Sequence, residues 1–172
     1  MNLTGSVTLN PGTYCGNIQI TSNADVELNP GVYVFDAISV QIAGGAKIRG
    51  DGVTFYYTSD SRAGHNLTIA GGAKVELSAP TSGEYQGILF YADPDASPNA
   101  SHSFGGGSTM NLKGVIYAPS QTFDFNGGAS ADGLQVMLLA RKIEMHGNSF
   151  VSITSDWDIP LPKQFQGARL VQ

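Results

Sequence analysis

Short runs of alternating apolar and polar residues recur along the chain, and each run ends at Gly, Pro, Asn or Asp. Three consecutive examples are "GVYVF" (31–35), "ISVQIA" (38–43) and "KIR" (47–49). A period of two, with Val, Ile, Phe and Tyr at the apolar positions, predicts β-strands. No window of helical length carries an apolar stripe with a period of 3.6 residues, so we expect almost no helix.

The same pattern returns at regular intervals. "AGGAK" occurs at 43–47 and again at 70–74, and "TLNPGTY" at 8–14 returns as "ELNPGVY" at 27–33. Short glycine-containing or polar corners follow one another at spacings of 22, 27, 35, 21 and 20 residues. These corners are "SNAD" (22–25), "GGAK" (44–47), "GGAK" (71–74), "GGST" (106–109), "GGAS" (127–130) and "GNSF" (147–150).

Each interval between corners contains three strand-like runs in the same phase, which is the signature of a solenoid. We therefore predict a right-handed parallel β-helix of six to seven coils, with three short strands per coil. The alternative is a set of unrelated hairpins with glycine turns, but hairpins would rarely keep three strands in phase for six rounds. The glycine pair is expected to turn the chain where φ is positive, and the small Ala lets successive corners stack.

The alternation also assigns faces to the strands. On the first strand of each coil, Val7, Val26, Ile48 and Val75 are expected to point inward. Glu27, Arg49 and Glu76 then form an outward acid–base–acid column that controls register and solubility. On the third strand the expected outward column is polar, and it consists of Gln19, Gln41, Thr68, Asp124 and Glu144.

The second strand of each coil is apolar on both sides. The predicted inward set is Val32, Val53, Ile88, Val115 and Leu134, with the aromatic residues Phe55, Phe90, Tyr117 and Phe125 also in the core. The predicted outward set is the candidate interaction face, and it comprises Tyr33, Phe35, Tyr56, Leu89, Tyr91, Ile116, Met137 and Leu139. A strand that is apolar on both sides is expected only where something covers it.

Three covers for this face are open: the end of the chain, a second copy, or a domain absent from this sequence. Residues 1–154 are expected to form the β-helix domain, and residues 155–172 an extended tail that caps or covers it. The tail lacks glycine corners, carries Trp157, and contains two prolines that keep it extended. The start of the chain runs straight into a repeat, which suggests an excised domain without its targeting segment.

Composition narrows the class of protein. The 172 residues are 41% hydrophobic and only 13% charged, with 22 glycines, which suits one folded domain with a surface of uncharged polar residues. A net charge of −5 with nine basic residues argues against a nucleic-acid partner. No apolar run approaches the 18 residues of a membrane span, so no membrane contact by this segment is expected. The single Cys15 excludes an internal disulfide and a thiolate zinc cluster.

Two loop insertions contain the few residues that could bind a ligand. They span 58–66 and 92–103, and their candidate ligands are Asp60, Arg62, His65, Asp93, Asp95 and His102. Clustered carboxylates suit calcium, and such a corner could also bind a sugar. The alternative is solvated loop tips, because Asp, Ser, Pro and Asn are turn formers and the spaced ligands of a calcium loop are missing. No catalytic or phosphate-binding motif is present, so we expect no enzyme and no cofactor.

Several segments resemble a known family. "LNPGVYVF", "IAGGAKIRGDGVTFYY", "VELSAPTSGEYQGILFY", "LKGVIYAPSQTFDFNGG" and the ending "ARLVQ" are similar to the C-terminal region of bacterial tight-adherence (Flp) pilus-assembly proteins of the TadE/G-like group. The resemblance implies a location on the periplasmic or extracellular side of a bacterial envelope, with an N-terminal anchor. It supplies no catalytic residues. Family copies of "YCG" often have a second cysteine later in the solenoid, whereas "LQVMLLA" here has none.

Three function classes remain at this point. The first is a non-enzymatic, pilus-associated scaffold or adhesion module that acts through protein–protein contacts. The second is an adhesive, carbohydrate-binding or ice-binding β-helix, although the charged first-strand column spoils the flat Thr-rich face that ice binders need. The third is a polysaccharide-degrading β-helix enzyme of the pectate-lyase-like kind, which resembles a long solenoid with an acid cluster and a basic residue on one face. The polar columns here contain no such cluster.

Overall fold

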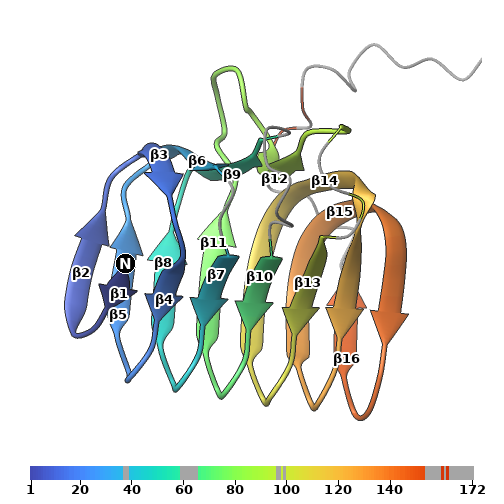
Figure 1. Ribbon diagram of the computed structural model, residues 1–172. Coiled ribbons are helices and arrows are strands. Elements are labelled where there is room, and N and C mark those ends of the chain that lie inside the picture. Colours follow the sequence, from blue (N-terminus) through green and yellow to red (C-terminus); the bar gives the residue numbers. More distant parts are fainter. Residues whose placement is uncertain are drawn as a thin grey trace, which may run out of the picture.

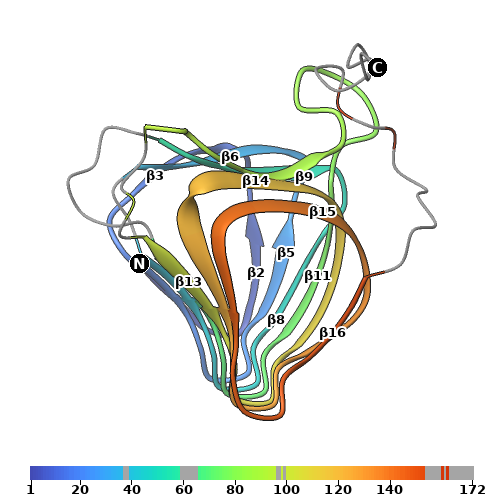
Figure 2. The same cartoon turned by 90° about the vertical axis from the view of Figure 1, so that its right-hand side faces the viewer.

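The computed structural model describes residues 1–36, 39–58, 66–95, 98, 100–153, 160 and 162. The described residues contain β-strands and no helix. Every strand pairing is parallel, and strands that lie about one coil apart in the sequence are neighbours in space. Seen from the C-terminal coil, the chain climbs the right-hand side, crosses the top from right to left, descends the left-hand side and advances toward the viewer (Figure 2). The chain is therefore a right-handed parallel β-helix, as predicted.

The strands form three layers around one core, and Figure 1 shows the coils side by side. The first-strand layer comprises β2 (Ser6–Leu9), β5 (Asp25–Leu28), β8 (Lys47–Gly50), β11 (Lys74–Ser78), the beginnings of β14 (Thr109–Phe125) and β15 (Ser130–Met145), and β16 (Phe150–Ile153). The second-strand layer comprises β3 (Gly12–Cys15), β6 (Gly31–Asp36), β9 (Val53–Tyr57), β12 (Ile88–Ala92) and the middle parts of β14 and β15. The third-strand layer comprises β1 (Asn2–Leu3), β4 (Ile18–Ile20), β7 (Ser39–Ile42), β10 (Asn66–Ile69), β13 (Ser101–Phe104) and the ends of β14 and β15.

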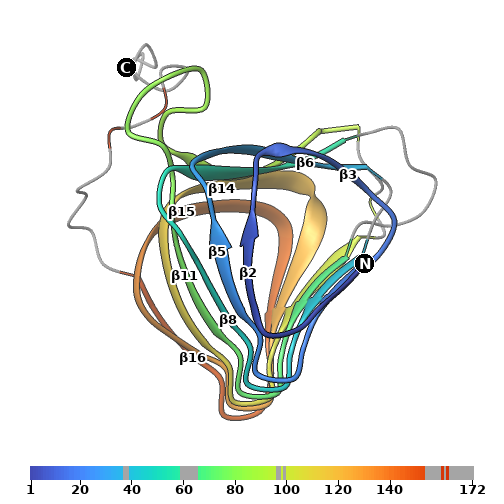
Figure 3. The same cartoon turned by 90° about the vertical axis from the view of Figure 1, so that its left-hand side faces the viewer.

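The glycine corners lie one above another at the narrow edge of the solenoid, at the bottom of Figures 2 and 3. Gly44 and Gly45 have φ of +62° and +72°, the left-handed region that glycine adopts without steric cost. The Gly45 N–H donates to the Gly71 carbonyl of the next corner at 2.9 Å. Ala46 and its counterpart Ala73 are fully buried inside the turn. Both predicted roles, a positive-φ turn and a small stacking residue, are confirmed.

One corner has serine where Ala46 and Ala73 stand in the others, and this difference allows a test of how the corners pack. Ser108 takes the position of Ala46, is fully buried, and its hydroxyl has no hydrogen-bond partner among the described residues. An unsatisfied buried hydroxyl costs free energy, so we expect Ser108→Ala to raise the free energy of unfolding by about 1 kcal/mol. Urea denaturation measures this directly, with Ser101→Ala on an exposed position as the control. A loss of stability in Ser108→Ala would contradict the interpretation of this corner.

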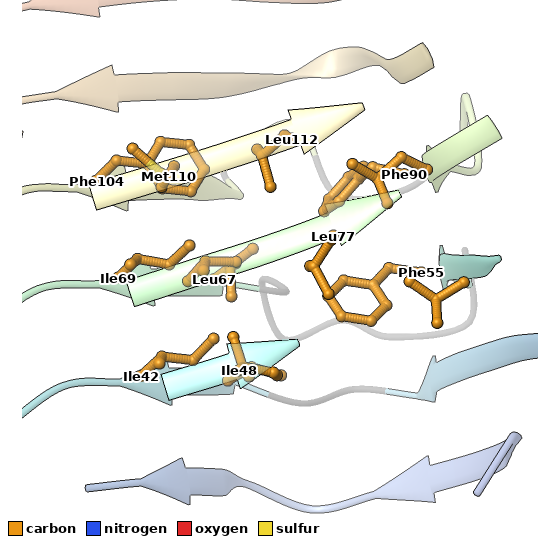
Figure 4. Close-up of a cluster of buried hydrophobic side chains, with 14 of the residues drawn as sticks. Ile42, Ile48, Phe55, Leu67, Ile69, Leu77, Phe90, Phe104, Met110 and Leu112 are labelled. Carbon is orange, nitrogen blue, oxygen red and sulfur yellow. The ribbon is translucent and has the colours of Figure 1, made fainter. Parts of the chain in front are cut away.

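The core is built from columns of identical or similar side chains. In the first-strand layer Val26, Ile48 and Val75 lie in register and are buried, while Glu27, Arg49 and Glu76 lie outward in register. Both predicted columns are confirmed. Figure 4 shows how apolar side chains from all three layers meet in the middle. These side chains include Ile42, Ile48, Phe55, Leu67, Ile69, Leu77, Phe90, Phe104, Met110 and Leu112.

The predicted outward column of the third-strand layer is also present. Gln19, Gln41 and Thr68 lie in register, and Asp124 and Glu144 continue the column on later coils. The side chain of Ser103, from a strand that the sequence pattern did not predict, lies between Thr68 and Asp124 in this column. This outward column is polar at every one of these positions.

The second-strand layer corrects the predicted faces. Gly31 pairs with Val53, so Tyr33 pairs with Phe55, and both side chains lie in the core together with Phe35. A β-bulge between Ile88 and Phe90 brings Leu89 into the core as well. Since a one-residue change of register turns every side chain to the opposite face, the outward placement of Tyr33, Phe35, Leu89 and Ile116 was wrong. Tyr117 was expected inside but lies outward.

Burial predicts a strong contrast between two layers. Ile88 is buried, whereas the side chain of Gln41 is exposed on the third-strand layer. We expect Ile88→Ala to lower the free energy of unfolding by about 2–4 kcal/mol, because a cavity remains. Gln41→Ala should cost only a few tenths of a kcal/mol, about the usual value for a surface change. Urea denaturation of both variants measures the difference, and equal losses would contradict the assignment of these faces.

Candidate interaction face

Three tyrosines stack on the outer side of the second-strand layer. Tyr56 of β9, Tyr91 of β12 and Tyr117 of β14 lie in register on consecutive coils. Their ring centroids are 5.3 Å apart at both steps, with interplanar angles of 15° and 16°. All three side chains are half-buried. We call Tyr56, Tyr91 and Tyr117 the tyrosine column. Its rings cover one another's faces, and each side chain keeps part of its surface exposed.

The column continues onto exposed apolar side chains at one end. Tyr117 pairs with Leu139 of β15, whose side chain is 44% exposed. Met137, two residues earlier on the same strand, is 42% exposed. Of the eight predicted interaction-face residues, Tyr56, Tyr91, Met137 and Leu139 therefore lie outward. The surface that they form with Tyr117 is a strip of aromatic edges and aliphatic groups.

A fourth tyrosine borders the column from the loop between β11 and β12. Tyr85 packs edge-on against Tyr56, with ring centroids 6.2 Å apart and an angle of 79°. The loop is closed by the Gly87 N–H, which donates to the Pro80 carbonyl at 2.7 Å. This loop rises above the second-strand layer at the top of Figures 2 and 3. Tyr85 was not predicted, although its place in "APTSGEYQGILF" lies next to the strand of Tyr91.

Described residues of the C-terminal tail contact the base of the same loop. Gly87 has a φ of +77°, and a Cβ added there would lie 3.0 Å from Pro162 Cδ and still closer to the Pro160 carbonyl oxygen. Pro162 is buried. Part of the tail therefore lies over the second-strand layer. The rest of residues 154–172, including Trp157, lies outside the described residues.

Burial and neighbouring groups raise the pKa of two tyrosines of the column. Burial is the main cause that raises the pKa of Tyr56, and the nearby Asp93 carboxylate is the second. Burial, followed by the neighbouring phenols Tyr117 and Tyr56, raises the pKa of Tyr91. Because a neutral phenol both donates and accepts hydrogen bonds, the column presents a row of hydrogen-bonding hydroxyls on an aromatic surface.

The buried Tyr33 makes the protein sensitive to alkali. Burial, and then the neighbouring Tyr14 phenol, raise the pKa of Tyr33 from 10.0 to about 12. The unfolded chain loses this proton at lower pH than the folded protein. The stability that the buried, protonated Tyr33 contributes is therefore complete below pH 10 and is lost as pH rises through about 12. We expect the urea midpoint to fall between pH 9.5 and pH 11.5 by more in wild type than in Tyr33→Phe. Identical pH profiles would contradict the burial of Tyr33.

The predicted ligand loops do not form one site within the described residues. Asp93 is half-buried, and its carboxylate accepts a hydrogen bond from the Asp95 N–H at 2.9 Å, which is a local turn contact. Asp60, Arg62 and His65 lie outside the described residues. No group of three or more His, Cys, Asp or Glu side chains in the described part of the chain could share a metal ion.

His102 is a core residue, so its prediction as a loop ligand was wrong. It belongs to β13 and is fully buried. Its Nδ1 accepts a hydrogen bond from the Leu67 N–H at 3.2 Å, so the proton lies on Nε2, which is 2.6 Å from Gln121 Oε1. Phe90 and Phe123 pack against the ring. The imidazole fills a core position and satisfies two neighbours.

The first-strand layer contains a polar depression. It encloses about 440 Å³ beside the loop that holds Tyr85. Arg49 on its floor forms an ion pair of 2.9 Å with Asp25, and Ser78 donates to Asp51 at 2.7 Å. The other polar residues around it are Glu76, Thr81, Asn111 and Lys113. Charges of both signs alternate here, so the depression favours no single ligand charge.

A search of the described residues for a membrane-spanning helix found none of sufficient length and hydrophobicity.

Comparison with known proteins gives the family but not a function. The fold and the tyrosine column define a right-handed parallel β-helix with an aromatic strip on its second-strand layer. Residues 2–159 match the family described as a domain of unknown function (DUF7305), and the chain belongs to this family. No curated protein and no solved structure matches the chain.

Proposed function

We propose that this β-helix is a non-enzymatic scaffold or adhesion module that binds a protein partner through the tyrosine column. The carrying observation is the register that stacks Tyr56, Tyr91 and Tyr117 on the outside and continues onto exposed Leu139. Tyrosine edges combine apolar contact area with a hydrogen-bonding hydroxyl at low conformational cost, and they are enriched in protein interfaces.

The geometry also supports a rigid surface rather than an adaptable one. Each ring of the column is held by its neighbours at 5.3 Å, and the backbone beneath is a parallel sheet with a packed aromatic core. A surface whose side chains are ordered before binding loses little entropy when a partner docks. A partner with a complementary row of apolar and hydrogen-bonding groups fits this strip.

We further propose that the partner belongs to the cell envelope, and that it is a component of a tight-adherence pilus or a neighbouring domain of the same protein. The support is the sequence resemblance of "APTSGEYQGILF" and "GVIYAPSQ" to pilus-assembly proteins. Both segments border the tyrosine column, since they contain Tyr85, Tyr91 and Tyr117 or lead directly into their strands. Two of the segments behind the resemblance therefore help to build the strip.

The test is site-specific photocross-linking in the organism that encodes the chain. A photoreactive amino acid at position 117 is expected to give a discrete protein adduct, and the same group at Thr68, on the polar third-strand layer, is expected to give none. The adduct at 117 should disappear in Tyr91→Asp while the abundance of the protein stays the same. Equal adducts from both positions, or adducts with glycan alone, would overturn the proposal.

A further inference from the structure

The C-terminal end of the solenoid exposes side chains that belong to core columns. Phe123 and Phe125 are 1% and 5% exposed on β14, and in the next coil they pair with Ile143 and Met145 of β15. Ile143 is 51% exposed and Met145 is 53% exposed. These two residues occupy inward positions, so they are exposed because no further coil covers them among the described residues.

The first-strand layer ends in the same way. Ile153 of β16 pairs with Leu134 and is 57% exposed. Within the described residues β16 pairs only with β15, and the third-strand part of β15 pairs only with β14. The last coil therefore combines bare apolar side chains with unpaired strand edges (the orange coil at the right of Figure 1). Open edges of this kind template pairing with another chain.

The opposite end of the solenoid is better covered. Leu3 is buried, and Val7, Leu9 and Tyr14 of the first coil are partly buried against the core. The described tail residues do not cover the exposed side chains of the C-terminal coil. Pro160 and Pro162 lie against Gly87 instead, which precedes β12 on an earlier coil. The two ends are thus unlike each other, which favours contact between two C-terminal ends over head-to-tail stacking.

The charges on the last third-layer strand are self-complementary. Lys142 and Glu144 flank Ile143 on its outward side, and they form an ion pair of 2.6 Å within the chain. In an antiparallel pair with Ile143 opposite its own mate, Lys142 of each copy lies opposite Glu144 of the other. Opposite charges across an antiparallel pair are stabilising, and this arrangement satisfies two such pairs by one two-fold axis.

We propose that the occupant of this end is a second copy of the chain, which docks C-terminal coil against C-terminal coil about a two-fold axis at Ile143. The strand around Ile143 then pairs antiparallel with its mate, and Met145 and Ile153 become buried in the joint. This dimer contact is separate from the proposed partner surface at the tyrosine column, so an experiment can disprove either proposal without disproving the other.

Light scattering after size exclusion tests the dimer, with the full chain at concentrations from 1 to 500 µM. Wild type is expected to shift from monomer to dimer. Ile143→Glu should stay monomeric throughout, because two carboxylates would meet at the axis. Thr68→Glu, an outward change in the same layer, is the matched control and should dimerise like wild type. Thermal melts of all three distinguish loss of the dimer from loss of the fold.

Charge exchange tests the geometry independently. Lys142→Glu and Glu144→Lys should each weaken the dimer by about tenfold or more, and the double exchange should restore it. Ile143→Cys in a Cys15→Ser background should form a disulfide with its mate on oxidation, because opposed residues of an antiparallel pair lie within disulfide reach. Gln41→Cys in the same background should form none.

Three results would overturn the proposal. The first is a wild-type chain that remains monomeric at 500 µM. The second is a dimer that survives Ile143→Glu but dissociates in Tyr91→Asp, which places the joint at the tyrosine column. The third is a chain that dimerises only after deletion of residues 163–172, which shows that its own tail covers this end.

Discussion

Gly106→Ala is expected to lower the free energy of unfolding by about 2–5 kcal/mol. Gly106 has a φ of +59°, where an L-residue with a Cβ costs about 1–2 kcal/mol. An added Cβ would also lie 2.7 Å from the backbone nitrogen of Gly71 in the preceding coil, so the two stacked corners must move apart. Forced movement of a packed backbone adds about 1–3 kcal/mol.

Gly107 is the matched control for this substitution. Its φ of +72° is similar, but a Cβ there meets nothing within 4 Å. We expect Gly107→Ala to cost only the backbone term of about 1–2 kcal/mol. Urea denaturation of both variants separates conformational strain from contact between coils. Equal losses in the two variants would show that the corners do not stack as described.

Phe90→Ala is expected to cost about 3–5 kcal/mol, because it removes the central ring of the aromatic core. The Phe90 ring stacks on the Tyr57 ring, with ring centroids 4.6 Å apart. It also packs in a T-shaped arrangement with the rings of His102 and Phe123, at centroid distances of 5.0 Å and 5.8 Å. These neighbours come from different layers and coils, so they cannot all close the space that the ring leaves.

The next residue along the strand provides the comparison. Tyr91 points outward and is half-buried, although it stacks on both Tyr56 and Tyr117. We expect Tyr91→Ala to cost less than half as much as Phe90→Ala, about 1–1.5 kcal/mol from lost ring contacts. Denaturation curves with unchanged m-values measure both. A larger loss for Tyr91→Ala than for Phe90→Ala would reverse the faces of β12.

The sequence predicts the coil count, the corners and two of the three layers because their signals are local. The double glycine of "AGGAK" marks the turn, and strict alternation after it fixes which side of Val26, Ile48 and Val75 faces the core. Both features depend on steric requirements within a few residues, so a single sequence contains them.

The predicted faces of the second-strand layer were wrong because its register depends on contacts between coils. The sequence pattern predicts that the residue after glycine is equivalent in every coil, but Gly31 itself pairs with Val53, and the bulge at Leu89 shifts the next coil again. With apolar residues on both sides of the strand, alternation could not reveal the slip. Tyr33, Phe35 and Ile116 were therefore placed outside, and Tyr117 inside.

The strand that contains His102 was not predicted, for a different reason. The segment "SHSF" contains one strongly apolar residue, and its two serines are residues that favour turns. Its position directly before the "GGGST" corner was the available signal, since "NLTIA" stands in the same place before "GGAK". The Leu67 N–H and the Gln121 side chain that stabilise a buried imidazole come from other coils, and the sequence of β13 does not contain them.

Hydroxyl-radical footprinting with mass spectrometry tests most directly whether the second-strand layer presents the tyrosine column. Oxidation of the native protein should label Tyr91, Tyr117 and Leu139, which are half-buried or exposed, and should spare Tyr33 and Tyr57, which are fully buried. Protection of Tyr33 and Tyr57 should end when the protein is unfolded. Labelling of Tyr33 with protection of Tyr91 and Tyr117 in the free native chain would contradict both the register and the proposed interaction face.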